Sequence, residues 1–202
     1  MVDFKDKIKA YYRLEIEIIE KLDVDSLNEA LNCLLRHFES GSRVYIMGNG
    51  GSSATASHFV CDFNKGVCSE LDKRFDFICL NDNIPTLMAV ANDISFENVF
   101  LYQLEHKLKK EDLVIAISGS GNSHNVVKAV EYAKSIGSEI IAMTGYSGGK
   151  LAKLCDIHMH VPVDDMQITE DLHMGFDHMM MKILWTYLME KDGKQAIYRI
   201  NQ

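Results

Sequence analysis

Two stretches of the sequence place histidines and carboxylates at helical spacings. His58 and Asp62 lie four residues apart, so on a helix their side chains share one face. The stretch "TEDLHMGFDH" (169–178) holds five more such side chains: Glu170, Asp171, His173, Asp177 and His178. Imidazoles and carboxylates can move protons in catalysis, and they can also bind a divalent metal ion.

Spacing alone leaves the pairing within the second stretch open. Glu170 and His178 are eight residues apart, so their directions around a helix differ by roughly 80°, and they could still converge on one ion. His173 and Asp177 are four apart and form a rival pair on the same helix. A solvated surface pair is an equally simple interpretation of His58 and Asp62.

Two loops rich in glycine and serine follow apolar runs. They are "GNGGSS" (48–53) and "SGSGNS" (118–123). Glycines allow the backbone to approach a ligand closely, and serine hydroxyls at a helix start favour an anion. Neither a Walker A sequence nor GxGxxG is present, so the loops indicate a phosphate monoester rather than a nucleotide. They could also be ordinary connections, but in one parallel sheet two such loops can meet in one crevice.

The elements that would position these groups follow a regular alternation. Strands are predicted at 44–48, 76–80, 112–118, 139–145 and 157–163, and the longer helices at 51–63, 85–90, 96–108, 123–135 and 169–190. Short apolar runs separated by helices are typical of a parallel sheet covered on both faces. We predict an α/β fold, a doubly wound five-stranded parallel sheet flanked by helices. It forms a single domain over 1–202, with N-terminal helices in 1–40 and an α/β core over 43–190.

The N-terminal extension carries two predicted helices. The first has an apolar stripe made of Ile8, Tyr12, Ile16, Ile19 and Leu22. The second is expected to begin at Ser26, with Glu29 completing a capping box, and to end at 40–42. The pair could fold back on its own sheet or contact a partner subunit, and we expect subunit contact.

Composition excludes several classes of protein. The formal net charge is −8 and no basic block is present, so nucleic-acid binding is not expected. No apolar run approaches the ~20 residues of a membrane span. The five cysteines form no CxxC pair, which indicates free thiols in a reducing compartment. With a charged N-terminal stretch that does not resemble a secretory signal, we expect a soluble cytoplasmic protein.

Four motifs together resemble the sugar isomerase (SIS) domain family, and within it the phosphoheptose isomerases. They are "GNGGSSATASH" (48–58), "AND" (91–93), "ISGSGNS" (117–123) and "TEDLHMGFDH" (169–178). The resemblance covers nearly the whole chain. It implies metal-assisted aldose–ketose isomerisation of a phosphosugar through an enediol, converting sedoheptulose 7-phosphate to D-glycero-D-manno-heptose 7-phosphate for lipopolysaccharide or capsule. It also implies a homotetramer.

The resemblance further implies roles for individual residues. One Zn²⁺ would be held by His58, Asp62, Glu170 and His178. Asp62, Glu170 and His178 would be catalytic. The phosphosugar would be bound by Asn49, Gly50, Gly51, Ser52, Asn92, Asp93, Ser118, Gly119, Ser120, Ser123 and Glu170.

Three positions depart from the family pattern. Asp62 stands where the family has glutamate, which withdraws the carboxylate by about 1.5 Å, the length of one carbon–carbon bond. Glu170 replaces a glutamine, and Gly119 stands where threonine is common. We expect Glu170 to act as the base while Asp62 becomes mainly a metal ligand, with Mn²⁺ or Fe²⁺ as alternatives to Zn²⁺. The departures leave open another phosphosugar, or a non-catalytic protein that senses a phosphosugar or binds DnaA.

Overall fold

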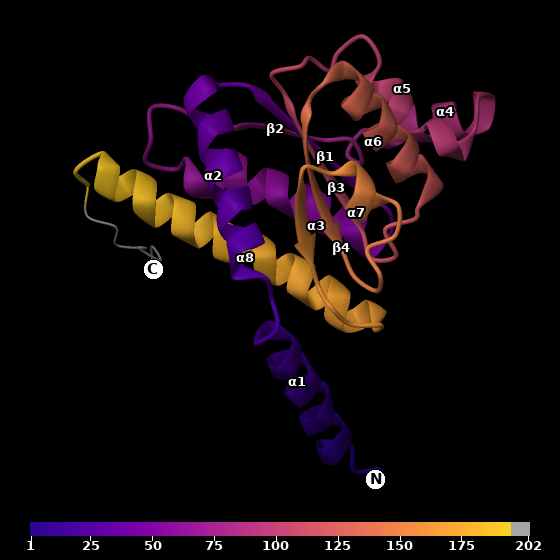
Figure 1. The fold of residues 1–202 in the computed structure, drawn as a ribbon, viewed down its shortest axis with the longest axis vertical. Helices are drawn as coiled ribbons and strands as arrows, with labels where there is room; N and C mark the ends of the chain where they lie inside the picture. Colours follow the sequence, from indigo (N-terminus) through magenta and orange to yellow (C-terminus); the bar gives the residue numbers. More distant parts are fainter. Residues whose placement is uncertain (195–202) are drawn as a thin grey trace.

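Five parallel strands form one sheet in the computed structural model, which describes residues 1–194. The strands are β1 (Arg43–Gly48), β2 (Asp76–Cys79), β3 (Leu113–Ser118), β4 (Glu139–Thr144) and β5 (Ile157–His160). Their order is β2-β1-β3-β4-β5 (Figure 1). The chain adds β2 on one side of β1 and the remaining strands on the other side, so the strand order reverses between β1 and β3. In register, Val44 of β1 pairs with Leu113 of β3. The predicted doubly wound parallel sheet is confirmed.

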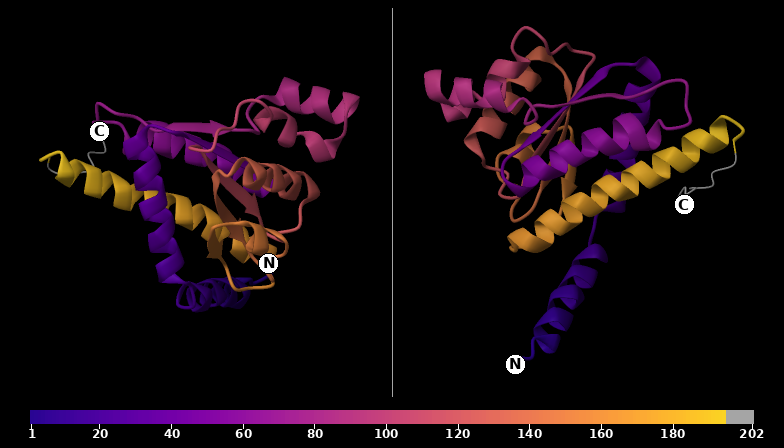
Figure 2. Two further views of the ribbon diagram at one scale, coloured as in Figure 1. Left: turned by 45° about the horizontal axis from the view of Figure 1, so that its top comes forward. Right: turned by 180° about the vertical axis from the view of Figure 1, so that it is seen from behind.

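Two layers of helices cover the sheet, because alternate residues of each strand point to opposite faces. Val44 and Ile46 join one core, which is covered by α2, α3 and α8. Tyr45 and Met47 join the other core, which is covered by α4, α5, α6 and α7. The bounds of these helices are α2 (Val24–Ser40), α3 (Gly51–Cys61), α4 (Ile84–Asp93), α5 (Leu101–Leu104), α6 (His124–Ile136), α7 (Leu151–Leu154) and α8 (Met166–Lys191). Figure 2 shows α3 and α8 side by side on one face.

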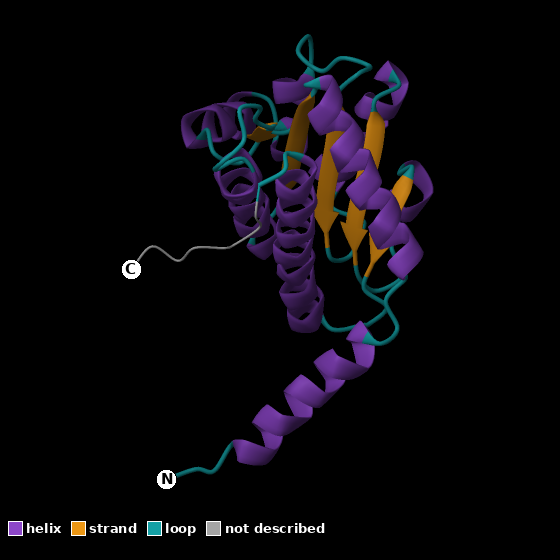
Figure 3. Ribbon diagram, turned by 90° about the vertical axis from the view of Figure 1, so that its left-hand side faces the viewer, coloured by secondary structure: helices purple, strands orange, loops and turns teal. Residues whose placement is uncertain are grey.

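The two N-terminal helices behave differently from one another. Helix α1 (Lys5–Ile19) extends away from the sheet, whereas α2 packs against it (Figure 3). Four residues of the predicted stripe on α1 are therefore exposed: Ile8, Tyr12, Ile16 and Ile19. The predicted start of the second helix was wrong, because Asp23 is its N-cap and accepts hydrogen bonds from the backbone N–H groups of Asp25 and Ser26.

Two other helices differ from the sequence prediction. The single helix expected over 96–108 is a 3₁₀ turn, Phe96–Asn98, followed by the short α5, and the left-handed φ of 62° at His106 lies just beyond its end. The helix after β1 changes at Asp62 into a π-helix, Asp62–Val67. Such wide turns occur frequently at functional sites. Within residues 1–194, no helix is long and apolar enough to cross a membrane.

Candidate functional site

A cavity of about 260 Å³ opens where β1 and β3 end. This is the point at which the strand order reverses, where parallel α/β sheets usually bind ligands. Both predicted phosphate loops and one turn of α8 form its walls, which comprise Asn49, Gly50, Gly51, Ser52, Ile117, Ser118, Gly119, Ser120, Ser123, Met166 and Glu170. The structure therefore brings nine of the expected substrate-binding residues to one cavity. Asn92 and Asp93 are not among its walls, because they lie exposed at the end of α4.

Two glycines give these loops their shape. Gly50 has a φ of 55° and precedes the first turn of α3. Gly121 has a φ of 64°, and a Cβ there would lie 2.0 Å from the carbonyl oxygen of Gly148. A side chain at either position would be strained, so the loops depend on glycine. Behind the second loop, the hydroxyls of Ser118 and Ser123 lie 3.1 Å apart.

A reciprocal pair of amides joins the first loop to the start of α6. Asn49 donates from Nδ2 to Oδ1 of Asn125 at 2.8 Å, and Asn125 donates back in the same way at 2.9 Å. Asn125 lies in the first turn of α6 and is 2% exposed. Asn125 was not predicted as a site residue, although an asparagine in the first turn after a serine-rich loop was a usable signal.

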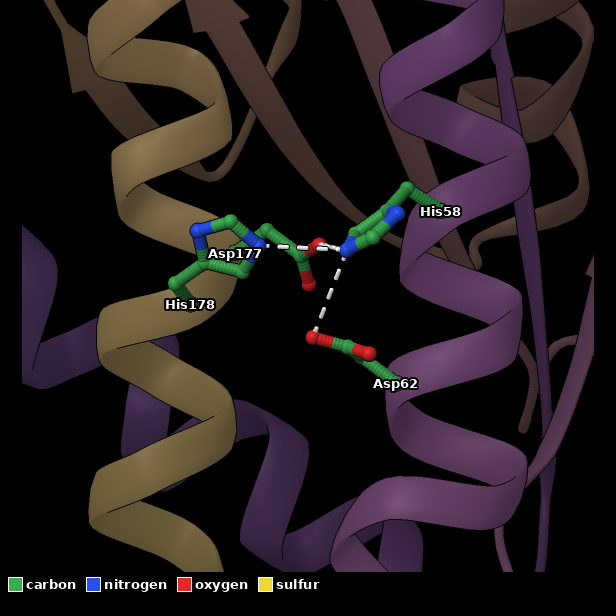
Figure 4. Close-up of side chains that lie close together, drawn as sticks. All are labelled: His58, Asp62, Asp177 and His178. Carbon is green, nitrogen blue, oxygen red and sulfur yellow. Dashed lines mark hydrogen bonds and ion pairs between the residues drawn. The ribbon is translucent and has the colours of Figure 1, made fainter.

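A second group of polar side chains lies between α3 and α8. His58 and Asp62 come from the end of α3 and the start of the π-helix, and Asp177 and His178 come from α8 (Figure 4). We call these four residues the His–Asp cluster. One ligand atom from each lies within 4.8 Å of all the others. The cluster thus joins His58 and Asp62 to one member of each pair expected on α8, Asp177 and His178, although the two stretches are more than 100 positions apart in the chain.

The spacing of these atoms suits a small four-coordinate ion. His58 Nε2 lies 3.1 Å from His178 Nε2, 3.6 Å from Asp62 Oδ2 and 3.9 Å from Asp177 Oδ2. Ligands about 2.0–2.1 Å from a tetrahedral zinc ion are roughly 3.3 Å apart. The His58 side chain is 42% exposed and His178 is also exposed, so the cluster is open to solvent on one side.

Asp177 is the member whose environment most needs an explanation. Its side chain is fully buried, and neither carboxylate oxygen has a hydrogen-bond partner. Burial, together with the nearby Asp62, raises the pKa of Asp177 to about 8. A buried, unpartnered carboxylate is costly unless a cation satisfies it. The four residues therefore fit a divalent metal ion, and this orphaned carboxylate is the observation that carries the fit.

Glu170 does not lie in the His–Asp cluster. It is eight residues before His178 on α8, a rise of roughly 12 Å along the helix axis. Its carboxylate instead faces the cavity, where a Cβ on Gly51 would lie 2.3 Å from Oε2. The structure thus differs from the expected ligand set, because it groups Asp177, and not Glu170, with His58, Asp62 and His178.

The rival pair on α8 is also resolved. His173 is 1% exposed, and burial lowers the pKa of its imidazole to about 4. It lies outside the His–Asp cluster, whereas Asp177 lies inside it. Spacing had left open a pairing of these two residues, and the structure places their side chains in different surroundings.

Comparison with known proteins shows the family of this chain. A family model described as SIS domain matches residues 8–145. The phosphoheptose isomerase of Helicobacter hepaticus is 36% identical over 172 residues, which cover 85% of this chain and 87% of that protein. The chain belongs to the phosphoheptose isomerase family of SIS-domain proteins.

Solved structures of the family have the same fold. The phosphoheptose isomerase of Neisseria gonorrhoeae superposes with a TM-score of 0.82 at 27% identity, covering 90% of this chain and 98% of that one. The phosphoheptose isomerase from Francisella tularensis gives 0.83 at 28% identity, covering 91% and 98%. The similarity to the family therefore extends over about nine tenths of the chain.

Proposed function

We propose that this protein is a metal-dependent phosphoheptose isomerase, which converts sedoheptulose 7-phosphate to D-glycero-D-manno-heptose 7-phosphate. The observation that carries the proposal is the relation between the cavity and the His–Asp cluster. The same two helices serve both: α3 runs from Gly51 at the cavity to His58, and α8 runs from Glu170 to His178. These spans of seven and eight residues rise roughly 10–12 Å.

That separation matches the length of the substrate. Six carbon–carbon bonds of about 1.5 Å place the end carbons of an extended heptose roughly 8 Å apart, and the phosphate ester adds to this length. With its phosphate in the serine loops, such a sugar would run along α3 and α8 and place C1 and C2 between Glu170 and the His–Asp cluster. The carboxylate of Glu170 lines the cavity with the loops, so it would approach C1 from the loop side.

Each group then has a role in the proton transfers. Ser118, Ser120 and Ser123 hold the phosphate at the start of α6, where the helix dipole favours an anion. Glu170 takes a proton from C1 of the ketose to give the enediol and returns it to C2. His178 moves the proton between the two oxygens. This assignment makes Glu170 the base and leaves Asp62 as a ligand.

The metal ion would be held by His58, Asp62, Asp177 and His178. Two imidazoles and two carboxylates form a nitrogen and oxygen donor set that suits Zn²⁺, and also Mn²⁺ or Fe²⁺. When bound, the ion polarises the sugar carbonyl as a Lewis acid. Its charge also satisfies the buried carboxylate of Asp177.

The test is an isomerase assay with sedoheptulose 7-phosphate on the purified full chain. We expect turnover that is lost on chelation and restored by Zn²⁺, and that is absent in His178→Ala. Glu190→Gln is the matched control, because Glu190 is an exposed carboxylate on the same helix and should keep full activity. If the protein turns over another phosphosugar but not this one, the proposed substrate is wrong and the proposed isomerisation stands. Phosphosugar binding without any turnover would indicate a sensor.

The assembly and cellular setting form part of the proposal. The exposed stripe Ile8, Tyr12, Ile16 and Ile19 supports packing of α1 in a homo-oligomer, which we expect to be a tetramer. The free thiols support a cytoplasmic enzyme, and its product would supply lipopolysaccharide or capsule synthesis. Light scattering of Ile8→Glu/Ile16→Glu checks the assembly: smaller particles than those of the unaltered chain are expected, and unchanged particles would contradict it.

A further inference from the structure

A second group of metal-binding side chains lies outside the proposed active site. Cys33 and His37 are four residues apart on α2, and Glu139 is the first residue of β4. One ligand atom from each lies within 4.8 Å of the other two. We call these three residues the thiol cluster. Cys33 is 0% exposed and His37 is 8% exposed, whereas the Glu139 side chain is 31% exposed and so reaches solvent.

We propose that the thiol cluster is a second metal site, which binds a divalent ion of the Zn²⁺ class. Sulfur, imidazole and carboxylate ligands together favour Zn²⁺ over Mn²⁺ or Mg²⁺, because a thiolate is a soft ligand. Three protein ligands leave a fourth position for water on the exposed side of Glu139. The proposal does not depend on the isomerase function, because these residues take no part in the cavity or in the His–Asp cluster.

The distances within the cluster suit a bound ion. His37 Nε2 lies 3.2 Å from Glu139 Oε2, close to the roughly 3.3 Å between two ligands of tetrahedral zinc. The other carboxylate oxygen, Oε1, accepts a hydrogen bond from Arg36 Nη2 at 2.6 Å. Arg36 thus fixes the carboxylate and leaves Oε2 facing His37 and Cys33.

The far side of the imidazole is held as it is in many metal sites. His37 Nδ1 lies 2.6 Å from the hydroxyl of Ser42, which in turn lies 2.9 Å from the hydroxyl of Ser40. A metal-bound histidine commonly donates its other ring N–H to such an oxygen, which fixes the ring orientation. An ion would select the tautomer in which Nδ1–H donates to Ser42 and Nε2 is free to bind, whereas without an ion Nε2–H can donate to Glu139 Oε2.

The position of the cluster indicates what a bound ion would do. Cys33 and His37 lie in the C-terminal half of α2, and Glu139 begins β4 at the end of the strands opposite the cavity. An ion held by all three would join α2 to β4. Because it binds the folded chain, the ion would raise the free energy of unfolding without entering the reaction.

Co²⁺ titration of the metal-stripped full chain provides the test, because cobalt replaces zinc and reports its ligands. We expect two Co²⁺ per chain and a sulfur-to-cobalt charge-transfer band in the near ultraviolet. The His–Asp cluster has no thiolate, so this band belongs to the thiol cluster. Asp177→Asn should lose one equivalent and keep the band, whereas Cys33→Ser should lose one equivalent together with the band.

Controls separate this site from the other thiols. Cys155→Ser removes a partly buried thiol outside both clusters, and Cys61→Ser removes the exposed thiol beside Asp62. Both should keep the band and both equivalents. Absence of the band in the unaltered chain, or its loss in Cys61→Ser, would overturn the proposal whether or not Cys33→Ser folds. If the enzyme fails the isomerase assay but shows this band, only the proposed function is lost.

Discussion

The His–Asp cluster and the thiol cluster contain similar residue types, but their polar atoms are satisfied to different degrees. In the thiol cluster, Glu139 pairs with Arg36 and His37, and His37 also contacts Ser42. In the His–Asp cluster, both oxygens of the buried Asp177 lack any hydrogen-bond partner. The thiol cluster is stable as a hydrogen-bond network and can accept an ion. The His–Asp cluster is costly to the folded chain until an ion is bound.

This difference indicates which of the two clusters is the active site. A buried carboxylate without a hydrogen-bond partner is costly to the folded chain, and groups whose pKa values are strongly shifted in this way are enriched at functional sites. Asp177 therefore points to the place of chemistry more strongly than the number of histidines or carboxylates does. The thiol cluster by contrast leaves few polar atoms unsatisfied when no ion is bound, and a bound ion would raise the free energy of unfolding.

The largest expected effect comes from removing the charge of Asp177. Asp177→Asn keeps the size of the side chain and deletes the negative charge that faces the ion. Lewis-acid assistance is worth several kcal/mol, so kcat should fall by roughly 10³-fold or more, with loss of one bound metal ion. Cys33→Ser should change kcat by less than about twofold. Steady-state assays with metal analysis check both variants. An equal loss of kcat in the two would contradict the assignment of catalysis to the His–Asp cluster alone.

The next effect is a dependence of stability on pH in the metal-free protein. The pKa of Asp177 is about 8 in the folded chain, against 3.8 for an unperturbed aspartate. Unfolding at neutral pH therefore releases a proton, and the free energy of unfolding falls as the pH rises from about 4 to about 8. The loss is on the order of 5 kcal/mol, because each pKa unit corresponds to about 1.4 kcal/mol.

Urea unfolding of the chelated protein at several pH values measures this loss. Other groups also titrate in this range, so the informative quantity is the difference between the unaltered chain and Asp177→Asn. That difference should grow with pH in favour of the variant. A constant difference would mean that Asp177 does not have a raised pKa in the folded chain, and the contrast between the two clusters would fail.

The sheet and its loops were largely predictable from the sequence, because short apolar runs and glycine-rich turns are local signals. The composition of the His–Asp cluster was less so. His58 and Asp62 share a helix face, but whether Glu170 or Asp177 joins them depends on how α8 packs against α3. Periodicity does not fix that rotation, and the resemblance favoured Glu170, whereas the structure groups Asp177.

Other features escaped the sequence because they arise only from tertiary contacts. The π-helix at Asp62 has no local signature, and Asn125 acquires its role by meeting Asn49 from a loop 76 positions away. The thiol cluster likewise joins α2 to a strand more than 100 positions later. Helix caps were predictable in kind, but Asp23 rather than Ser26 occupies the N-cap of α2.

A smaller loss of kcat is expected when Glu170 is changed. The metal content of the same variant tests whether Glu170 lies apart from the metal ligands. Glu170→Gln removes the proposed base, so kcat should fall by about 10²-fold, while one metal ion stays in the His–Asp cluster. The double variant Asp62→Glu/Glu170→Gln returns a longer carboxylate to the cluster and should recover part of the activity. Kinetics and metal content of both variants decide this. Loss of the metal in Glu170→Gln alone would place Glu170 among the ligands.

The smallest effect is a weaker affinity of the thiol cluster for its ion in Ser42→Ala. Ser42→Ala removes the hydroxyl that lies 2.6 Å from His37 Nδ1 and so frees the imidazole to rotate. Loss of such a supporting contact commonly weakens metal binding by about 10- to 100-fold, and we expect the lower end because Ser42 is partly exposed. The cobalt–sulfur band should therefore saturate at roughly tenfold higher Co²⁺, with kcat unchanged. Ser135→Ala is the control, because its hydroxyl bonds only within its own helix turn, to the carbonyl of Tyr132. Equal titration curves for the two variants would show that His37 does not bind the ion through an oriented ring.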